Sequence, residues 1–277
     1  MRFSKKKLLF MFAIVVSGYL FIMVFPFLWI FITSFKTSGE IFGTGAFHVI
    51  PEDPTLKNYA IILFEKGILR AIVNSFVVAI STTIYVIVVA SLCAYAISRF
   101  HFKGKSILLG LVLAVSMFPQ MIITGPVYNL FYDLGWLNSY FVILPYSTIT
   151  LPMAVWILVT HFNQIPLALE ESAKIDGATR IQTLTKIVFP LAAPGVFTTA
   201  IITFIAAWNE FLLTITLNTE SSFHTVPVAI SFLRDQFSIL WGEVAAATTI
   251  VTIPTLIIVL IFQRQIVSGL TSGGVKE

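Results

Sequence analysis

Leu169-Glu170-Glu171-Ser172-Ala173-Lys174-Ile175-Asp176-Gly177-Ala178 is a charged stretch that lies between two long apolar segments of this chain. Pro166 suits the first turn of a helix, and the two acids follow in early turns, where the helix dipole favours negative charge. Asp176-Gly177 then stops this helix, because Gly readily adopts the left-handed conformation. Ala178 to Phe189 can form a second helix, ended by Pro190 and Pro194. The stretch therefore predicts a water-facing helical hairpin over about residues 166–190.

The side chains of this hairpin suggest a docking surface for a soluble partner. Ser172 and Ala173 are small enough to allow close approach, while Glu171 and Asp176 can engage cations on a partner. The alternative is an ordinary amphipathic loop helix at the lipid headgroups, because capping signals of this kind recur in many loops. The residues alone leave both interpretations open.

The composition indicates a membrane protein. The 277 residues are 57% hydrophobic and 11% charged, whereas a soluble domain is about 45–50% apolar and about 25% charged. So little charge cannot cover a water-exposed surface of this size. Lys5, Lys6 and Lys7 precede an apolar segment that is too long for a cleaved signal, so we expect this segment to be a retained first span.

Six apolar segments are each long enough to cross a hydrocarbon core of about 30 Å at about 1.5 Å per residue. They lack the alternation of barrel strands, so we expect helices. The chain is predicted to be an all-α membrane protein with six transmembrane helices in a single domain, residues 1–277. The predicted spans cover about residues 8–32, 71–97, 106–127, 140–160, 196–217 and 245–262. Prolines that interrupt them, expected to be tolerated kinks, are Pro26, Pro119, Pro145, Pro152 and Pro254.

The distribution of Lys and Arg predicts the orientation. Of the 17 Lys and Arg residues, twelve fall on the side of the membrane that holds both chain ends and the hairpin, and five fall on the other side. Because cytoplasmic loops carry the excess of positive charge, both termini and the hairpin are predicted to be cytoplasmic. The same signals account for the net charge of +4, so no nucleic-acid partner is expected. Segments 34–70 and 218–244 then face outward.

Trp208-Asn209-Glu210 lies inside the fifth predicted span. Glu210 would sit about 21 Å from the cytoplasmic end, at about 1.5 Å per residue, and a charge at that depth needs a cavity or a partner. Asn209 adds an amide, and Trp208 offers a flat face of the kind that stacks on sugar rings. We interpret these residues as candidates for a substrate path. The alternative is a structural role in which Glu210 bonds a neighbouring helix or extends its carboxylate outward.

Several kinds of chemistry are disfavoured by the sequence. The four histidines have no metal-ligand spacing, so no metal site is predicted. The complete phosphate-binding motif, Gly, four residues, Gly-Lys-Thr/Ser, is absent, so any ATP must be hydrolysed by another chain. No nucleophile motif supports an intramembrane enzyme. An ATP-independent secondary transporter or a channel stays as the alternative, although neither explains the hairpin.

Several motifs resemble the inner-membrane permease subunits of binding-protein-dependent ABC importers. Their signature reads Glu-Ala-Ala, three residues, Gly, nine residues, Ile, one residue, Leu-Pro. This chain has Glu171-Ser172-Ala173, Gly177 and Ile187-Val188-Phe189-Pro190 at the same spacing, with Ser172 and Phe189 as departures. Further motifs resemble the maltose-type carbohydrate branch, over about residues 10–275: Asn74-Ser75, Cys93-Ala94-Tyr95-Ala96-Ile97-Ser98-Arg99-Phe100, Phe102-Lys103-Gly104, Leu144-Pro145-Tyr146 and Trp208-Asn209-Glu210-Phe211.

The resemblance implies a type I ABC importer permease fold in the inner (cytoplasmic) membrane, without catalysis or a cofactor of its own. It implies a homologous second permease, two ATP-binding subunits that bind ATP and Mg, an extracytoplasmic sugar-binding protein and the lipid bilayer as partners. In the family the first hairpin helix is a coupling helix that docks in a cleft of the ATPase. The predicted ATPase-coupling residues are therefore Glu170, Glu171, Ser172, Ala173, Asp176 and Gly177. The segment 218–244 is a candidate contact for the binding protein, and the sugar itself is not predicted.

Overall fold

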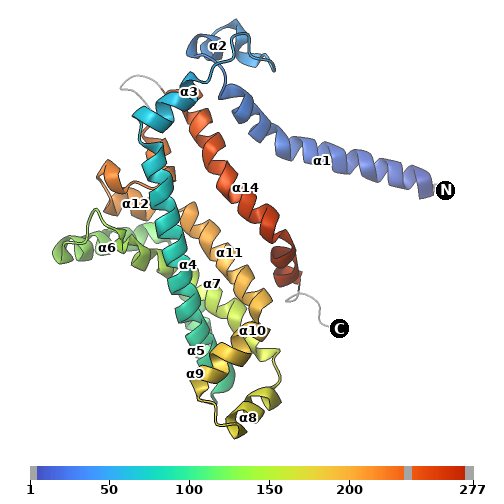
Figure 1. The fold of residues 1–277 in the computed structure, drawn as a ribbon, viewed down its shortest axis with the longest axis vertical. Helices are drawn as coiled ribbons and strands as arrows, with labels where there is room; N and C mark the ends of the chain where they lie inside the picture. The colour runs from blue at the N-terminus through green and yellow to red at the C-terminus, as the bar shows by residue number, and fades with distance from the viewer. Residues whose placement is uncertain (1–4, 234–238, 272–277) are drawn as a thin grey trace. The chain divides into compact units, whose positions relative to one another are not determined.

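The chain is almost entirely helical. The computed structural model describes residues 5–233 and 239–271 (Figure 1). Four helices are long and apolar enough to cross a membrane, and two bent pairs of shorter helices meet the same criterion if each pair is one span. The four single candidates are Leu9–Thr33, Ile68–Arg99, Tyr140–Asn163 and Trp241–Arg264. The all-α membrane fold is thus confirmed, while the cytoplasmic position of the termini stays a prediction.

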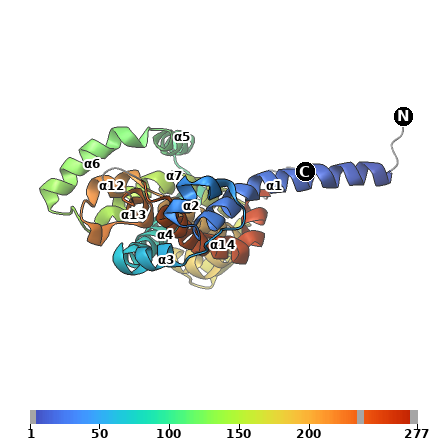
Figure 2. The same ribbon diagram turned by 90° about the horizontal axis from the view of Figure 1, so that it is seen from above.

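Two of the predicted spans are not single helices. The predicted span 106–127 is split into α5 (Lys105–Ser116) and α6 (Gln120–Leu134), which meet at 88° (Figure 2). The break lies at Pro119, which has no amide hydrogen with which to continue the hydrogen-bond ladder of α5. The predicted span 196–217 is split into α11 (Ala193–Trp208) and α12 (Leu212–Leu217). Apolar continuity therefore located these segments but not their internal breaks.

The contacts of the chain define two compact units, which are described separately. Among the described residues, unit 1 comprises 5–69, 230–233 and 239–253, and unit 2 comprises 70–229 and 254–271. The prediction of a single domain over residues 1–277 stays a prediction. The elements of unit 1 are α1 (Lys5–Thr33), α2 (Ser38–Phe42), η1 (Thr44–Phe47), α3 (Lys57–Ala60), η2 (Ile61–Glu65) and the first part of α14 (Trp241–Thr271).

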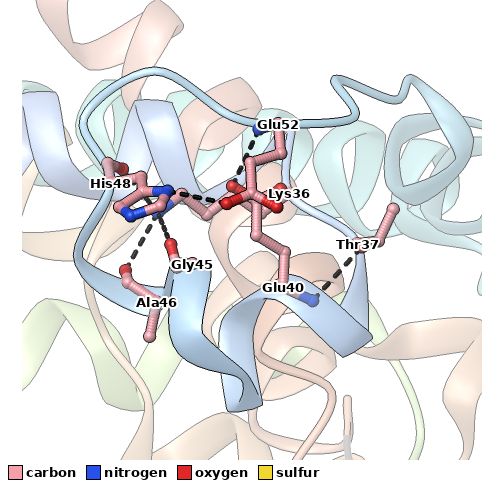
Figure 3. A network of polar contacts seen from close by, with 7 residues as sticks. All are labelled: Lys36, Thr37, Glu40, Gly45, Ala46, His48 and Glu52. Atoms are coloured by element: carbon pink, nitrogen blue, oxygen red, sulfur yellow. Dashed lines mark hydrogen bonds and ion pairs between the residues drawn. The ribbon is translucent and has the colours of Figure 1, made fainter.

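Residues 36–48 of unit 1 fold around one buried ammonium group (Figure 3). Lys36 is 1% exposed. Its Nζ donates to three backbone carbonyl oxygens, those of Gly45, Ala46 and His48, at 3.2, 2.9 and 2.7 Å. Three acceptors satisfy the three N–H donors of an ammonium group, so the charge can be buried. The beginning of the segment predicted to face outward is therefore an ordered structure.

Unit 2 contains the apolar core. Its remaining elements are α4 (Ile68–Arg99, from Arg70 onward), η3 (Tyr140–Val142), α7 (Ile143–Asn163), α8 (Leu167–Ile175), α9 (Arg180–Thr183), η4 (Leu184–Val188), α10 (Phe189–Leu191), η5 (Ser221–Phe223) and most of α13 (Val226–Ser231). Buried residues of α4, α7, η4 and α11 form one cluster. Ala90 and Ala94 of α4, both fully buried, belong to it, and small side chains of this kind allow helix backbones to approach closely.

The contact between α7 and α11 depends on a residue without a side chain. A Cβ atom added at Gly195 of α11 would lie 2.3 Å from carbon atoms of the His161 imidazole of α7. That distance is far below ordinary van der Waals contact, for which carbon atoms lie about 3.5–4.0 Å apart. Gly195 therefore leaves the space that the His161 ring fills, and it fixes how closely these two helices pack.

Candidate functional site

The predicted hairpin contains α8 (Figure 1). This helix begins after Pro166 and is followed by a left-handed glycine, Gly177. Gly177 has φ +83°. Its amide donates to the Lys174 carbonyl at 3.1 Å, and the Ala178 amide donates to the Ala173 carbonyl at 2.9 Å. This pair of bonds is the Schellman motif, which satisfies the last carbonyl groups of a helix. Gly177 therefore has the conformation that the sequence predicts for it.

The second half of the hairpin differs from the predicted helix 178–189. Thr179 forms a capping box with Gln182, so α9 begins at Arg180. The helical run continues through the π-helical η4 and through α10 before it bends by 83° into α11. Pro190 does not end the run, because it lies in the first turn of α10, where no amide donor is needed. The predicted end at Pro190 is therefore wrong by two residues.

The six predicted coupling residues do not share one face of the hairpin. Those that are exposed are Glu171, Ser172, Asp176 and Gly177. Ala173 is buried, with 7% exposure. Ile175, which is not among the residues predicted from the sequence, is 86% exposed. Its signal is the spacing of four residues from Glu171, which places both on one helical face.

Glu170 points inward and ties α8 to the end of α4. Its Oε1 accepts a hydrogen bond from Arg99 Nε, and its Oε2 accepts one from the Tyr95 hydroxyl at 2.9 Å. The side chains of Arg99 and Glu170 are 7% and 11% exposed. Arg99 also donates from Nη2 to the Ile165 carbonyl at 3.3 Å. The sequence placed Tyr95 and Arg99 in a motif but could not pair them with Glu170, which lies 71 residues beyond Arg99.

Trp208, one of three predicted path residues, is a packed side chain in unit 2. It is 2% exposed. Its ring packs edge-on against Phe76 at 4.8 Å between centroids and stacks with Phe204 at 5.7 Å. With both contacts in place, the indole face is not open to a sugar ring.

Asn209 and Glu210 lie in the break between α11 and α12. Asn209 is exposed, and its Nδ2 donates to the Ile205 carbonyl at 2.8 Å. Glu210 is 8% exposed. Its carboxylate accepts from the backbone amides of Leu213 and Thr214, at 2.8 and 3.3 Å. These amides begin α12, where helix donors have no partner within the helix.

Glu210 also connects this break to the other broken span. Gln120 Nε2, in the first turn of α6, donates to Glu210 Oε1 at 2.9 Å. The Glu210 carboxylate therefore accepts hydrogen bonds from both broken spans. This arrangement agrees with the structural role given above as the alternative, in which Glu210 bonds a neighbouring helix.

Known proteins with related sequences and folds agree with this architecture. The family described as "Binding-protein-dependent transport system inner membrane component" matches residues 86–272. The trehalose/maltose transport system permease protein MalG of Thermococcus litoralis is 41% identical over 259 residues, 92% of each chain. The trehalose transport system permease protein SugB of Mycobacterium tuberculosis is 40% identical over 254 residues, 91% of this chain and 92% of that protein. A solved bacterial ABC transporter for import of the acidic polysaccharide alginate has a chain with the same fold, with a TM-score of 0.81 and 19% identity over 95% of this chain and 99% of that chain.

Proposed function

Because this chain belongs to the binding-protein-dependent family of inner-membrane transport components, we propose that it is a permease subunit of an ATP-driven importer of sugars or oligosaccharides. The names of two relatives support the substrate class: one is named for trehalose and maltose transport, and the other for trehalose transport. The bent and broken apolar helices also suit a transport path, because irregular backbone at membrane depth is tolerated where it is buried or lines a cavity.

The complete importer would contain several other chains. We propose a homologous second permease, two ATP-binding subunits and an extracytoplasmic sugar-binding protein. A related alginate transporter has been solved in complex with a pentasaccharide-bound periplasmic protein, which supports the last of these. This chain would have no catalytic role, since ATP and Mg would be bound by the ATP-binding subunits. The hairpin would face the cytoplasm, and the segment 218–244, of which residues 234–238 lie outside the described chain, would face the binding protein.

The observation that carries this proposal is the hairpin with its capped helix α8. Glu171 and Ile175 lie exposed on one face of α8, and the Schellman motif at Gly177 holds the end of that helix in place. We therefore propose Glu171, Ile175 and Asp176 as the residues that contact the ATPase. Ala173 would act through packing inside the hairpin, and Gly177 through its backbone conformation.

Replacement of Ile175 by alanine tests the proposed docking face. Burial of an isoleucine side chain is worth about 1.5–3 kcal/mol, so we expect copurification of the ATPase with the permease to weaken roughly tenfold, and uptake to fall with it. Ile50→Ala is a matched control, because Ile50 is 81% exposed in the segment predicted to face outward. Unchanged copurification with Ile175→Ala and Glu171→Lys together would contradict the docking face. Sugar uptake that persists without ATP would favour a secondary transporter instead.

The roles proposed for the path residues also follow their contacts. The burial of Trp208 between two phenylalanines supports a packing role rather than stacking on the sugar. The three hydrogen bonds accepted by Glu210 support a role in stabilising the break between α11 and α12. Asn209 has an exposed side chain, which leaves it as the residue proposed to meet the substrate.

A further inference from the structure

One end of α4 holds the hairpin through a buried ion pair. Both carboxylate oxygens of Glu170 are used, one by Arg99 and one by the Tyr95 hydroxyl. Separation of these groups would leave a buried charge without a partner, which is strongly unfavourable. Any displacement of α8 should therefore carry this end of α4 with it. A second contact supports the attachment, since the Arg180 guanidinium of α9 lies 4.7 Å from the centre of the Phe100 ring, next to the end of α4.

The other end of α4 holds the residues that follow α12. Asn74 is 1% exposed, and its Nδ2 donates to the carbonyl oxygens of Ser222 and His224, both at 2.9 Å. The hydroxyl of Ser75, 2% exposed, accepts from the Val226 amide at 2.8 Å. The segment 222–226 is thus bound to α4 through its backbone.

Two further contacts strengthen this attachment. The Tyr140 hydroxyl donates to Asn74 Oδ1 at 2.7 Å, which fixes the orientation of the Asn74 amide. Arg70 Nε donates to the Ser222 carbonyl at 3.0 Å. Every group of the Asn74 side chain is thereby engaged, so this end of α4 and the segment 222–226 form one polar network.

Between these two ends α4 is a continuous helix. Asn74 and Arg99 are 25 residues apart, about 38 Å along the axis at about 1.5 Å per residue. Of the four long single helices in the described part of the chain, α4 is the one without a proline; the others contain Pro26, Pro152 and Pro254. Sharp kinks almost always need a proline, a glycine–serine pair or a similar defect, so α4 is suited to transmit a displacement without bending.

We infer that α4 is the element that couples the hairpin to the segment 222–226, and that Glu170, Arg99 and Asn74 are its positioning residues. This inference rests on the proposed function, because it takes α8 as the contact with the ATPase. Glu170 then differs from its neighbour Glu171: it does not touch the ATPase but passes the movement of α8 to α4. Rigid secondary-structure elements and networks of hydrogen bonds and ion pairs can carry coupling of this kind between distant sites, and α4 provides the rigid element with a polar network at each end.

The test uses the complete transporter in proteoliposomes, with its binding protein and ATP-binding subunits. For Glu170→Gln and for Asn74→Ala we expect copurification of the ATPase within about twofold of the unaltered transporter. Stimulation of ATP hydrolysis by the sugar-loaded binding protein should fall at least about tenfold, with uptake. The double exchange Glu170→Arg with Arg99→Glu should restore part of the stimulation. Lys57→Gln, an exposed change outside the hairpin and outside α4, is the control and should behave like the unaltered chain.

A second readout separates coupling from stability. A spin label at Ser221, next to the segment held by α4, should change its mobility when a non-hydrolysable ATP analogue is added, and Glu170→Gln should abolish this change. If Glu170→Gln does not reach the membrane, Tyr95→Phe removes one of the two side-chain contacts of Glu170 and is tested in its place. A mobility change that persists in the variant would overturn the inference.

The outcomes also distinguish this inference from the proposed function. If the unaltered permease does not bind an ATPase, the proposed function fails. If Ile175→Ala weakens copurification but Glu170→Gln and Asn74→Ala keep full stimulation, the role of α4 is wrong and the proposed function stands.

Discussion

Replacing Gly177 with alanine should loosen the end of α8 through backbone strain alone. Gly177 has φ +83°, and a Cβ atom added there would meet nothing within 4 Å. The cost therefore comes from the left-handed conformation, about 1–2 kcal/mol for an L-residue. A change of this size shifts a local equilibrium by about 5–30-fold, so we expect the ratio of closed to open forms of the hairpin end to fall by that factor.

Hydrogen exchange in the assembled transporter measures this shift. The Ala178 amide, bonded to the Ala173 carbonyl at 2.9 Å, should exchange about 5–30 times faster in Gly177→Ala. Gly177→Asn should change the exchange rate much less, because asparagine tolerates the left-handed conformation. Sugar uptake should fall with Gly177→Ala and be largely kept with Gly177→Asn.

Gly135 provides a matched control at the end of α6. It has φ +67°, and its Cβ position is equally empty. The Trp136 amide donates to the Phe131 carbonyl at 2.8 Å, in the same pattern of bonds. Gly135→Ala should accelerate exchange at Trp136 to a similar extent without weakening ATPase binding. Equal exchange at Ala178 in the unaltered chain and in Gly177→Ala would refute the reasoning.

Three further predictions concern Lys36, Glu210, and the neighbours Trp208 and Asn209. Lys36→Met should destabilise the structure around it by about 1–3 kcal/mol, because buried carbonyl groups lose their hydrogen-bond donor. Residues 36–48 should then be cleaved faster by a protease, whereas the control Lys57→Met should be cleaved at the unaltered rate. Equal cleavage rates in the two variants would argue against this role of Lys36. Glu210→Gln should lower uptake more than assembly, since an amide cannot accept all three hydrogen bonds; a variant that assembles and transports normally would exclude this role. Trp208→Ala should lower the free energy of unfolding by about 3–5 kcal/mol, and Asn209→Ala by less than about 0.5 kcal/mol, as measured by thermal unfolding. If Trp208→Ala loses uptake but keeps full stability, the result would support stacking of Trp208 on the sugar instead.

The features that could be predicted from the sequence are those set by local chemistry. The left-handed Gly177 follows from the helix signals before it, and the apolar segments follow from continuous hydrophobic composition. The segment from Glu171 to Pro190 resembles a family signature, and this resemblance predicted the correct family. The prediction is specific because the matched positions keep their spacing over the whole segment. Each of these signals is complete within a short window of the chain.

The features that could not be predicted depend on distant partners. Glu170 and Glu171 are adjacent acids, and only the position of Arg99 decides which of them faces inward. The break after Trp208 likewise depends on Glu210, whose carboxylate receives a hydrogen bond from Gln120, 90 residues earlier. Pro119 predicts an interruption of its span, but a proline alone does not predict the angle of 88° between α5 and α6.

The contact between Gly195 and His161 has a consequence for how this chain can evolve. The imidazole occupies the volume that a side chain at position 195 would need, so position 195 is not free to gain a side chain while His161 is kept. A descendant that gains alanine at 195 must first, or at the same time, acquire a smaller residue at 161. Substitutions at the two positions should therefore be inherited together among related genes, and pairs of sequences that break this linkage should show α7 and α11 further apart.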